Sequence, residues 1–145
     1  MAVADEKGII ARTYENGFPV ILKLVDEMPS EEVRGHFQWL TVISWKYDGT
    51  SRNGMPDDAA NQRMIALESA IQEQLESKSL CRHAYSKTGN SLKELVYYIA
   101  DRDKFMSALN EALRDQPRYP IEIEFFADPE WSEFQNTLSR IKRPE

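Results

Sequence analysis

Residues 37–47, FQWLTVISWKY, decide the fold class of this chain. The odd positions are all residues that favour β-strands, and the even positions include Leu40 and Val42 at the centre. A strand with apolar residues on both faces is typical of the interior of a sheet that is covered on both sides. We therefore expect a central strand here, in a sheet with neither face open to water.

The segments before this strand predict a hairpin. Two apolar runs, at residues 8–14 and 18–25, flank Asn16-Gly17. Both turn residues tolerate a positive φ, which the tight turns of hairpins require. The sequence therefore predicts an N-terminal hairpin over residues 8–25.

The segments after this strand alternate between helical and extended patterns. Pro56 opens a helix whose apolar positions recur at helical spacing, namely Met64, Leu67, Ile71 and Leu75. The remaining elements are strands at 80–87, 92–100 and 121–125, a helix capped by Asp101, and a helix at 129–141. The last helix is expected to use Asp128 as N-cap and Pro129 as its first residue. It carries a stripe of Trp131, Phe134, Leu138 and Ile141.

The order of these elements predicts an α+β fold. Residues 36–127 follow the order β-α-β-β-α-β, which is the ferredoxin-like split βαβ arrangement. The hairpin 8–25 precedes this core, and the helix 129–141 follows it. No segment resembles a linker between domains, and 145 residues is an ordinary length for one domain. We expect a single domain over residues 1–145.

The composition bears on compartment and partners. A formal net charge of −6 disfavours binding to nucleic acid or to an acidic membrane surface. Cys81 is the only cysteine, so an internal disulfide is excluded. The polar N-terminus does not resemble a signal peptide, and no apolar run is long enough to span a membrane. These features predict a cytoplasmic protein that binds neither nucleic acid nor membrane.

The residues that carry most enzyme chemistry are sparse. His36 and His83 lie on different predicted strands, and neither has the spacing of metal ligands. Cys81 and His83 share a strand face, but no third group is in place to orient them. Glycine-rich phosphate-binding motifs are absent from the sequence. We expect no catalytic residues, no metal and no cofactor, and the balance is against an enzyme.

Two sets of aromatic and polar residues could bind a ligand. Trp45, Tyr47, Tyr97 and Tyr98 could stack bases as RNA-recognition modules do, but residues 92–98 lack the basic, glycine-bearing signature of such modules. The loop at 48–56 combines apolar and polar groups at its entry and within it. Its candidate binding residues are Trp45, Tyr47, Asp48, Arg52, Asn53 and Met55. The alternative is that the loop only makes a turn and starts a helix.

Several short motifs together resemble a known family. They are Trp45-Lys46-Tyr47-Asp48-Gly49, Gly54-Met55-Pro56, Leu67-Glu68, Tyr97-Tyr98 and Asp128-Pro129-Glu130-Trp131. In this order and spacing they are similar to the bacterial family called domain of unknown function 695. The resemblance implies no catalytic residues. It further suggests an architectural relation to the regulator of ribonuclease E activity B family, small acidic proteins that bind and restrain a nuclease.

Two functions remain open from the sequence. The first is a non-enzymatic protein-interaction or regulatory domain, with a protein partner or a second copy of the chain. The alternative is a small-molecule-binding or enzymatic domain that uses the 48–56 loop.

Overall fold

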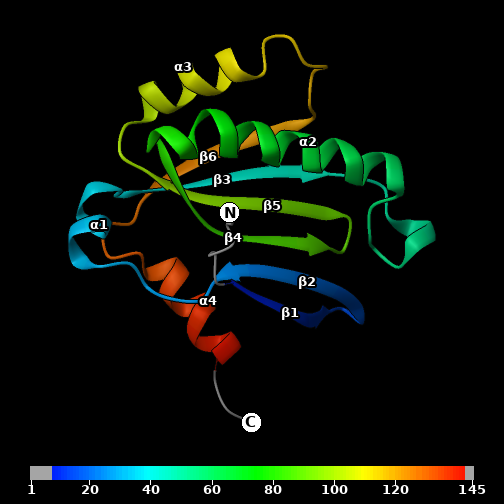
Figure 1. The fold of residues 1–145 in the computed structure, drawn as a ribbon. Helices are drawn as coiled ribbons and strands as arrows, with labels where there is room; N and C mark the ends of the chain where they lie inside the picture. The colour runs from blue at the N-terminus through cyan, green and yellow to red at the C-terminus, as the bar shows by residue number, and fades with distance from the viewer. Residues whose placement is uncertain (1–7, 143–145) are drawn as a thin grey trace.

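The computed structural model describes residues 8–142, which form one six-stranded sheet and four α-helices (Figure 1). The strands are β1 (Gly8–Glu15), β2 (Phe18–Val25), β3 (Trp39–Lys46), β4 (Cys81–Gly89), β5 (Leu92–Ile99) and β6 (Ile121–Ala127). The helices are α1 (Glu31–His36), α2 (Asp58–Gln74), α3 (Arg102–Ala112) and α4 (Ser132–Lys142). The α+β class predicted from the sequence is confirmed.

The strands follow the spatial order β1-β2-β4-β5-β3-β6, and every neighbouring pair is antiparallel. β1 and β2 form the predicted hairpin, with Asn16 and Gly17 at positive φ in its turn. β3 pairs with β5 on one side and β6 on the other, so it is an interior strand, as its apolar faces predict. The outer strands of the sheet are β1 and β6.

The helices α2 and α3 cover one face of the sheet (Figure 1). The helical stripe predicted for α2 is buried throughout, at Met64, Leu67, Ile71 and Leu75. Asp57 caps the helix by accepting a hydrogen bond from the Ala60 N–H at 2.8 Å. From α3, Phe105 and Leu109 join the same core.

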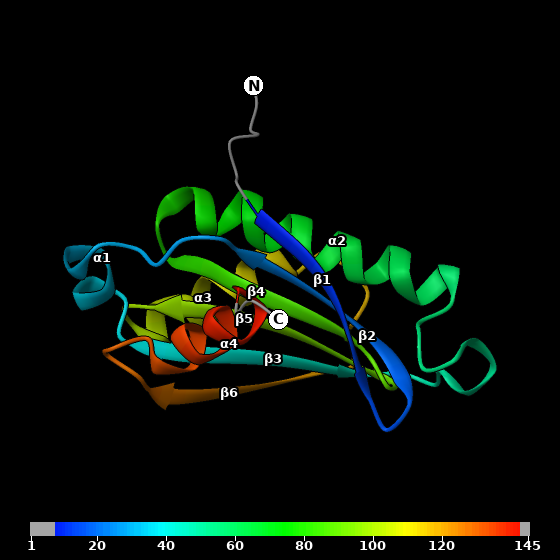
Figure 2. The same cartoon turned by 90° about the horizontal axis from the view of Figure 1, so that it is seen from below.

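The helix α4 covers part of the opposite face, where Figure 2 shows it over β4 and β5. Trp131 and Phe134 are each 1% exposed. The Trp131 ring stacks on Tyr98 with a centroid separation of 3.9 Å, and its indole N–H donates to the Phe37 carbonyl oxygen at 2.8 Å. The apolar stripe of the last helix therefore docks within the domain.

This helix begins at Ser132, three residues later than predicted. Trp131 has a φ of 58°, which interrupts the helical backbone immediately before Ser132. Asp128 still serves the helix start, because its carboxylate accepts hydrogen bonds from the Ser132 and Glu133 N–H groups at 2.8 and 3.0 Å. The segment Asp128-Pro129-Glu130 is thus a turn that directs Trp131 into the core.

The start of the core also differs from the sequence prediction. His36 is the last residue of α1 and does not lie on a strand. Phe37 caps that helix, and β3 begins only at Trp39. This helix is not evident from the sequence, because it is short and contains a glycine. A helix of so few turns shows no helical period in its apolar residues.

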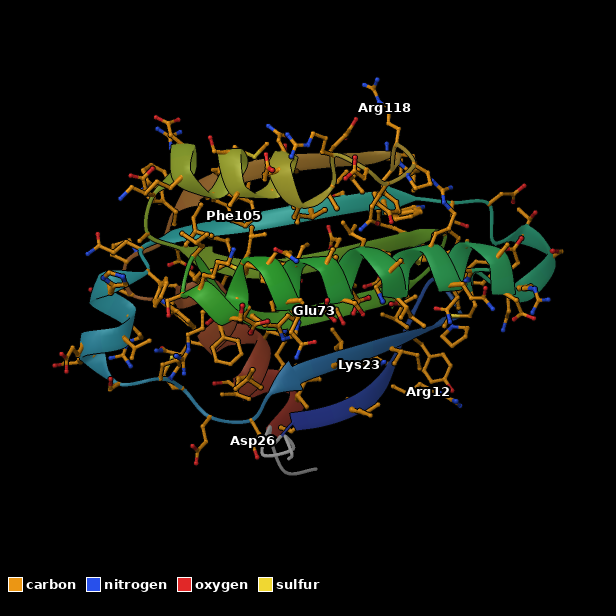
Figure 3. All side chains as sticks on the ribbon, turned by 45° about the horizontal axis from the view of Figure 1, so that its top comes forward. Arg12, Lys23, Asp26, Glu73, Phe105 and Arg118 are labelled. Carbon is orange, nitrogen blue, oxygen red and sulfur yellow. The ribbon has the colours of Figure 1, made fainter. Side chains whose placement is uncertain are left out.

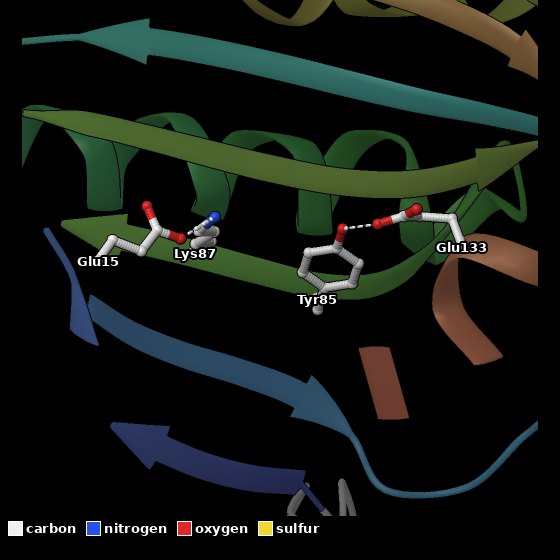
Figure 4. A network of polar contacts seen from close by, with 4 residues as sticks. All are labelled: Glu15, Tyr85, Lys87 and Glu133. Atoms are coloured by element: carbon white, nitrogen blue, oxygen red, sulfur yellow. Dashed lines mark hydrogen bonds and ion pairs between the residues drawn. The ribbon is translucent and has the colours of Figure 1, made fainter. Parts of the chain in front are cut away.

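Polar contacts tie the hairpin and α4 to β4 on this second face (Figure 4). The Tyr85 hydroxyl donates to Glu133 at 2.8 Å, and Lys87 forms an ion pair with Glu15. Leu22 and Leu24 of β2 belong to the same apolar cluster as Trp131. The hairpin is therefore held with its inner side toward α4.

Replacing Trp131 with alanine should lower the free energy of unfolding by about 3–5 kcal/mol, because a fully buried indole and its stack are lost. Urea unfolding followed by circular dichroism measures this. Phe126→Ala is the matched control, since Phe126 on β6 is 48% exposed and should change stability little. Equal stability of the two variants would show that Trp131 is not buried.

Candidate functional site

The carboxylate of Asp48 is bonded within the predicted binding loop. The Asp48 carboxylate accepts hydrogen bonds from the Thr50 hydroxyl at 2.7 Å and the Thr50 N–H at 3.1 Å, which together lower the pKa of Asp48. Thr50–Arg52 form a short 3₁₀ turn, and Asn53 follows it with a φ of 62°. Arg52 and Asn53 are exposed, and Met55 is half-buried.

The two aromatic candidates are both engaged within the protein. Trp45 is 4% exposed and packs beside Tyr119, with the Arg63 guanidinium 5.3 Å from its ring centre. The Tyr47 hydroxyl donates to the Gly54 carbonyl oxygen at 2.6 Å, and burial raises the pKa of Tyr47 to about 12. Trp45 therefore belongs to the core, and Tyr47 supports the loop through its hydrogen bond, so neither side chain presents a free recognition surface.

A hollow of about 960 Å³ lies elsewhere, between α2, the start of β4 and the segment after β2. None of the six candidate binding residues lines it. It exists because β2 pairs with β4 only from Val20 to Leu24 and then turns away. A β-bulge between His83 and Tyr85 lies at the point where the two strands separate.

The side chains of Cys81, His83 and Tyr97, from β4 and β5, line this hollow, as do Ile10 and Lys23 of the hairpin. The His83 and Tyr97 rings lie edge to face with centroids 5.5 Å apart. From α2 and the turn after it, Gln72 and Glu76 reach the hollow, and Glu76 accepts a hydrogen bond from the His83 backbone N–H at 3.3 Å. That carboxylate satisfies a backbone donor that no neighbouring strand reaches.

Burial sets the charge state of these groups. It lowers the pKa of His83 to about 4, against the opposing effect of the Glu68 carboxylate. It also raises the pKa of the Cys81 thiol and of the Tyr97 hydroxyl well above their ordinary values. All three side chains are neutral at pH 7, and the thiol lacks the thiolate character that a nucleophile needs. Cys81 and His83 share a face, as the sequence indicates, but Cys81 is not activated.

Glu68 lies on the rim between the hollow and the core. It forms an ion pair with Lys93 at 3.0 Å, so the buried ammonium of β5 has a partner. Across residues 8–142, no three histidine, cysteine or acidic side chains come together as a metal site would require. None of the helices described is long and apolar enough to cross a membrane.

This hollow is only partly indicated by residue patterns. The alternation of Cys81 and His83 on one strand was visible, but nothing in the sequence placed Gln72 and Glu76 opposite them. The aromatic residues considered as a base-stacking platform are also placed differently. Trp45, Tyr97 and Tyr98 are all buried in the core, so they present no open rings.

One comparison identifies the family of this chain. The family model described as Family of unknown function (DUF695) matches residues 11–139. The chain belongs to this family. The match extends from β1 into α4, so it takes in the docked Trp131 and the residues of α2, β4 and β5 that line the hollow. The resemblance to domain of unknown function 695 noted in the sequence is confirmed. No curated protein and no solved structure matches the chain.

The neutral state of His83 predicts a pH dependence of stability. Between about pH 6.5 and pH 4 the unfolded chain binds a proton at this residue and the folded chain does not. The free energy of unfolding should therefore fall through this window as the pH falls, by up to about 3 kcal/mol from His83. In His83→Gln this part of the decline should disappear, and His36→Gln, at the exposed end of α1, is the control. Parallel pH profiles for wild type and His83→Gln, measured by urea unfolding, would refute it.

Proposed function

We propose that this protein is a non-enzymatic interaction domain whose interaction surface is the outer edge of β1. The observation that supports this proposal most is the exposure of apolar residues on this edge strand. Ile10 is 74% exposed and Tyr14 is 63% exposed, and both alternate outward on the same face. A terminal strand with exposed apolar side chains is a template for another strand.

The opposite edge of the sheet is protected in a way that β1 is not. On β6, Glu122 and Glu124 alternate outward and are exposed, and charged side chains of this kind oppose strand addition. The corresponding row on β1 carries a single charge, at Arg12. This difference supports an interaction through β1 rather than β6.

The hairpin face that carries Ile10 and Tyr14 is the one on the α2 side, and α2 does not cover it. Figure 3 shows β1 and β2 extending beyond α2, with Arg12 and Lys23 on their strands. Lys23 pairs with Ile10 across the hairpin and is exposed like it. An added strand would therefore meet both unpaired backbone groups and accessible side chains.

The partner we propose is a second copy of this chain. An antiparallel pairing of two β1 strands about Arg12 sets Ile10 opposite Tyr14 of the other copy, twice by symmetry. Aromatic pairs with β-branched residues across strands each contribute about 0.2–1 kcal/mol. The same register brings two Arg12 side chains together at the axis, where their like charges oppose pairing.

The finer fold assignment, the family relation, the location and the alternative function each have less support. The order β4-β5-β3-β6, with helices α2 and α3 as connections, supports a ferredoxin-like core. The relation to the regulator of ribonuclease E activity B family and a cytoplasmic location rest on sequence alone. The alternative function, ligand binding by the 48–56 loop, has less support, because the carboxylate of Asp48 and the hydroxyl of Tyr47 are bonded within the loop.

Sedimentation equilibrium tests the proposed self-association. Wild-type protein should show a concentration-dependent dimer, and Ile10→Lys should weaken it at least tenfold. Arg12→Thr should strengthen it, because the repulsion at the axis is removed. Phe126→Lys on the other edge strand is the matched control and should leave the dimer unchanged.

Two results would reject this proposal. The first is a wild-type protein that remains monomeric at concentrations up to about 1 mM. A dissociation constant of about 1 mM corresponds to a binding free energy of only about 4 kcal/mol. The second is a dimer that Ile10→Lys does not weaken, because the contact would then lie elsewhere on the molecule.

A further inference from the structure

The dipeptide Asn-Gly occurs twice in the chain, and both copies lie in turns. Asn16-Gly17 joins β1 to β2, and Asn53-Gly54 lies in the 48–56 loop. The asparagines have φ angles of 53° and 62°, and the glycines that follow them have φ angles of 83° and 87°. In such a pair the glycine nitrogen can attack the side-chain amide before it, because glycine has no side chain to block a close approach. The two copies have the same local chemistry, so their surroundings decide which of them reacts.

The second copy is held firmly by its neighbours. Gly54 is buried, and its N–H donates to the Gly49 carbonyl oxygen at 2.8 Å. Its own carbonyl oxygen accepts a hydrogen bond from the Tyr47 hydroxyl at 2.6 Å. A Cβ placed on Gly54 would lie 2.9 Å from the backbone nitrogen of Asn90, so the chain is closely packed at this point. The nitrogen that would have to attack Asn53 is therefore both hydrogen-bonded and fixed in place.

The first copy lies open to water. Asn16 and Gly17 are both exposed, and a Cβ placed on Gly17 would meet nothing within 4 Å. Within the part of the chain that the structure describes, the Gly17 N–H makes no hydrogen bond. Water therefore reaches the N–H that must lose its proton, and no contact holds this turn in one geometry.

We propose that Asn16 is a site of spontaneous deamidation in the folded protein and that the fold protects Asn53 from the same reaction. The Gly17 backbone nitrogen loses its proton to hydroxide and attacks the side-chain carbonyl carbon of Asn16. The new N–C bond closes a succinimide ring while the bond to the side-chain nitrogen breaks, and that nitrogen leaves as ammonia with a proton from water. Water then opens one of the two C–N bonds of the ring, which yields aspartate or isoaspartate. No atom is oxidised or reduced.

The reaction changes the hairpin in two ways. Both products put a carboxylate next to Glu15, which forms an ion pair with Lys87 (Figure 4). Isoaspartate also lengthens the main chain by one carbon, which disturbs a two-residue turn in which Glu15 pairs with Phe18. The reacting turn lies beyond the end of β1, and the inference does not depend on the pairing of β1 with another strand.

Peptide mapping by mass spectrometry tests the inference, because trypsin separates the two sites. Cleavage after Lys23 and Arg52 places Asn16 and Asn53 in different peptides, and fragment ions locate the modified residue. The folded wild-type protein is incubated at mildly alkaline pH, and the deamidated fraction at each site is followed over time. Asn16 should deamidate at least tenfold faster than Asn53, with isoaspartate among its products. Equal rates, or a faster reaction at Asn53, would overturn the inference.

The same protein unfolded in guanidinium chloride separates the effect of the fold from that of the sequence. Both Asn-Gly pairs are then free, so the rate at Asn53 should rise to about that at Asn16. A difference that persists unchanged in the unfolded chain would show that neighbouring residues set the rates, and it would reject the protective role of the fold. Asn16→Gln is the control for the assignment, because its longer side chain closes a ring slowly and the peptide that carries it should stay unmodified.

Discussion

The indole ring of Trp131 lies on the phenol ring of Tyr98 with an interplanar angle of 9°, between α4 and the sheet. Both polar ends of this pair are satisfied, since the Trp131 N–H donates to Phe37 and the Tyr98 hydroxyl donates to Asp128 at 2.7 Å. A buried aromatic stack with no unpaired polar atom stabilises α4 strongly on the sheet. Because Leu22 and Leu24 join the same cluster, the position of the hairpin follows from it. The side chains that alternate away from this cluster on β1 are left at the surface.

The candidate interaction surface and the hollow share one structural origin. β2 leaves β4 after Leu24, and α2 lies over β4 and β5 rather than over the hairpin. The early separation of the two strands opens the hollow, and the limited reach of α2 leaves the outer side of the hairpin uncovered. A longer pairing of β2 with β4 would close the hollow and would remove the need for Glu76 to satisfy the His83 N–H.

Most of the fold was predictable because it depends on local patterns. The alternation around Leu40 and Val42 and the helical spacing from Met64 to Leu75 report directly which side chains are buried. The start of α4 was predicted wrongly, because Trp131 takes a positive φ, which its residue type does not indicate. The hollow escaped prediction for a related reason, since it depends on the distance between α2 and a bulged strand. For Trp45 and Tyr47 the sequence suggested a binding site that the structure does not show. Aromatic residues beside a loop can either pack within the protein or bind a ligand, and residue type does not distinguish the two.

The outer edge of β1 is the surface through which we propose that this chain pairs with another strand. Hydrogen exchange of individual backbone amides, measured at low and high protein concentration, tests this directly. The amides of β1 that point away from β2 should exchange more slowly at high concentration, while those on the outer edge of β6 should exchange at the same rate in both samples. Fast exchange along the outer edge of β1 at every concentration would contradict the claim.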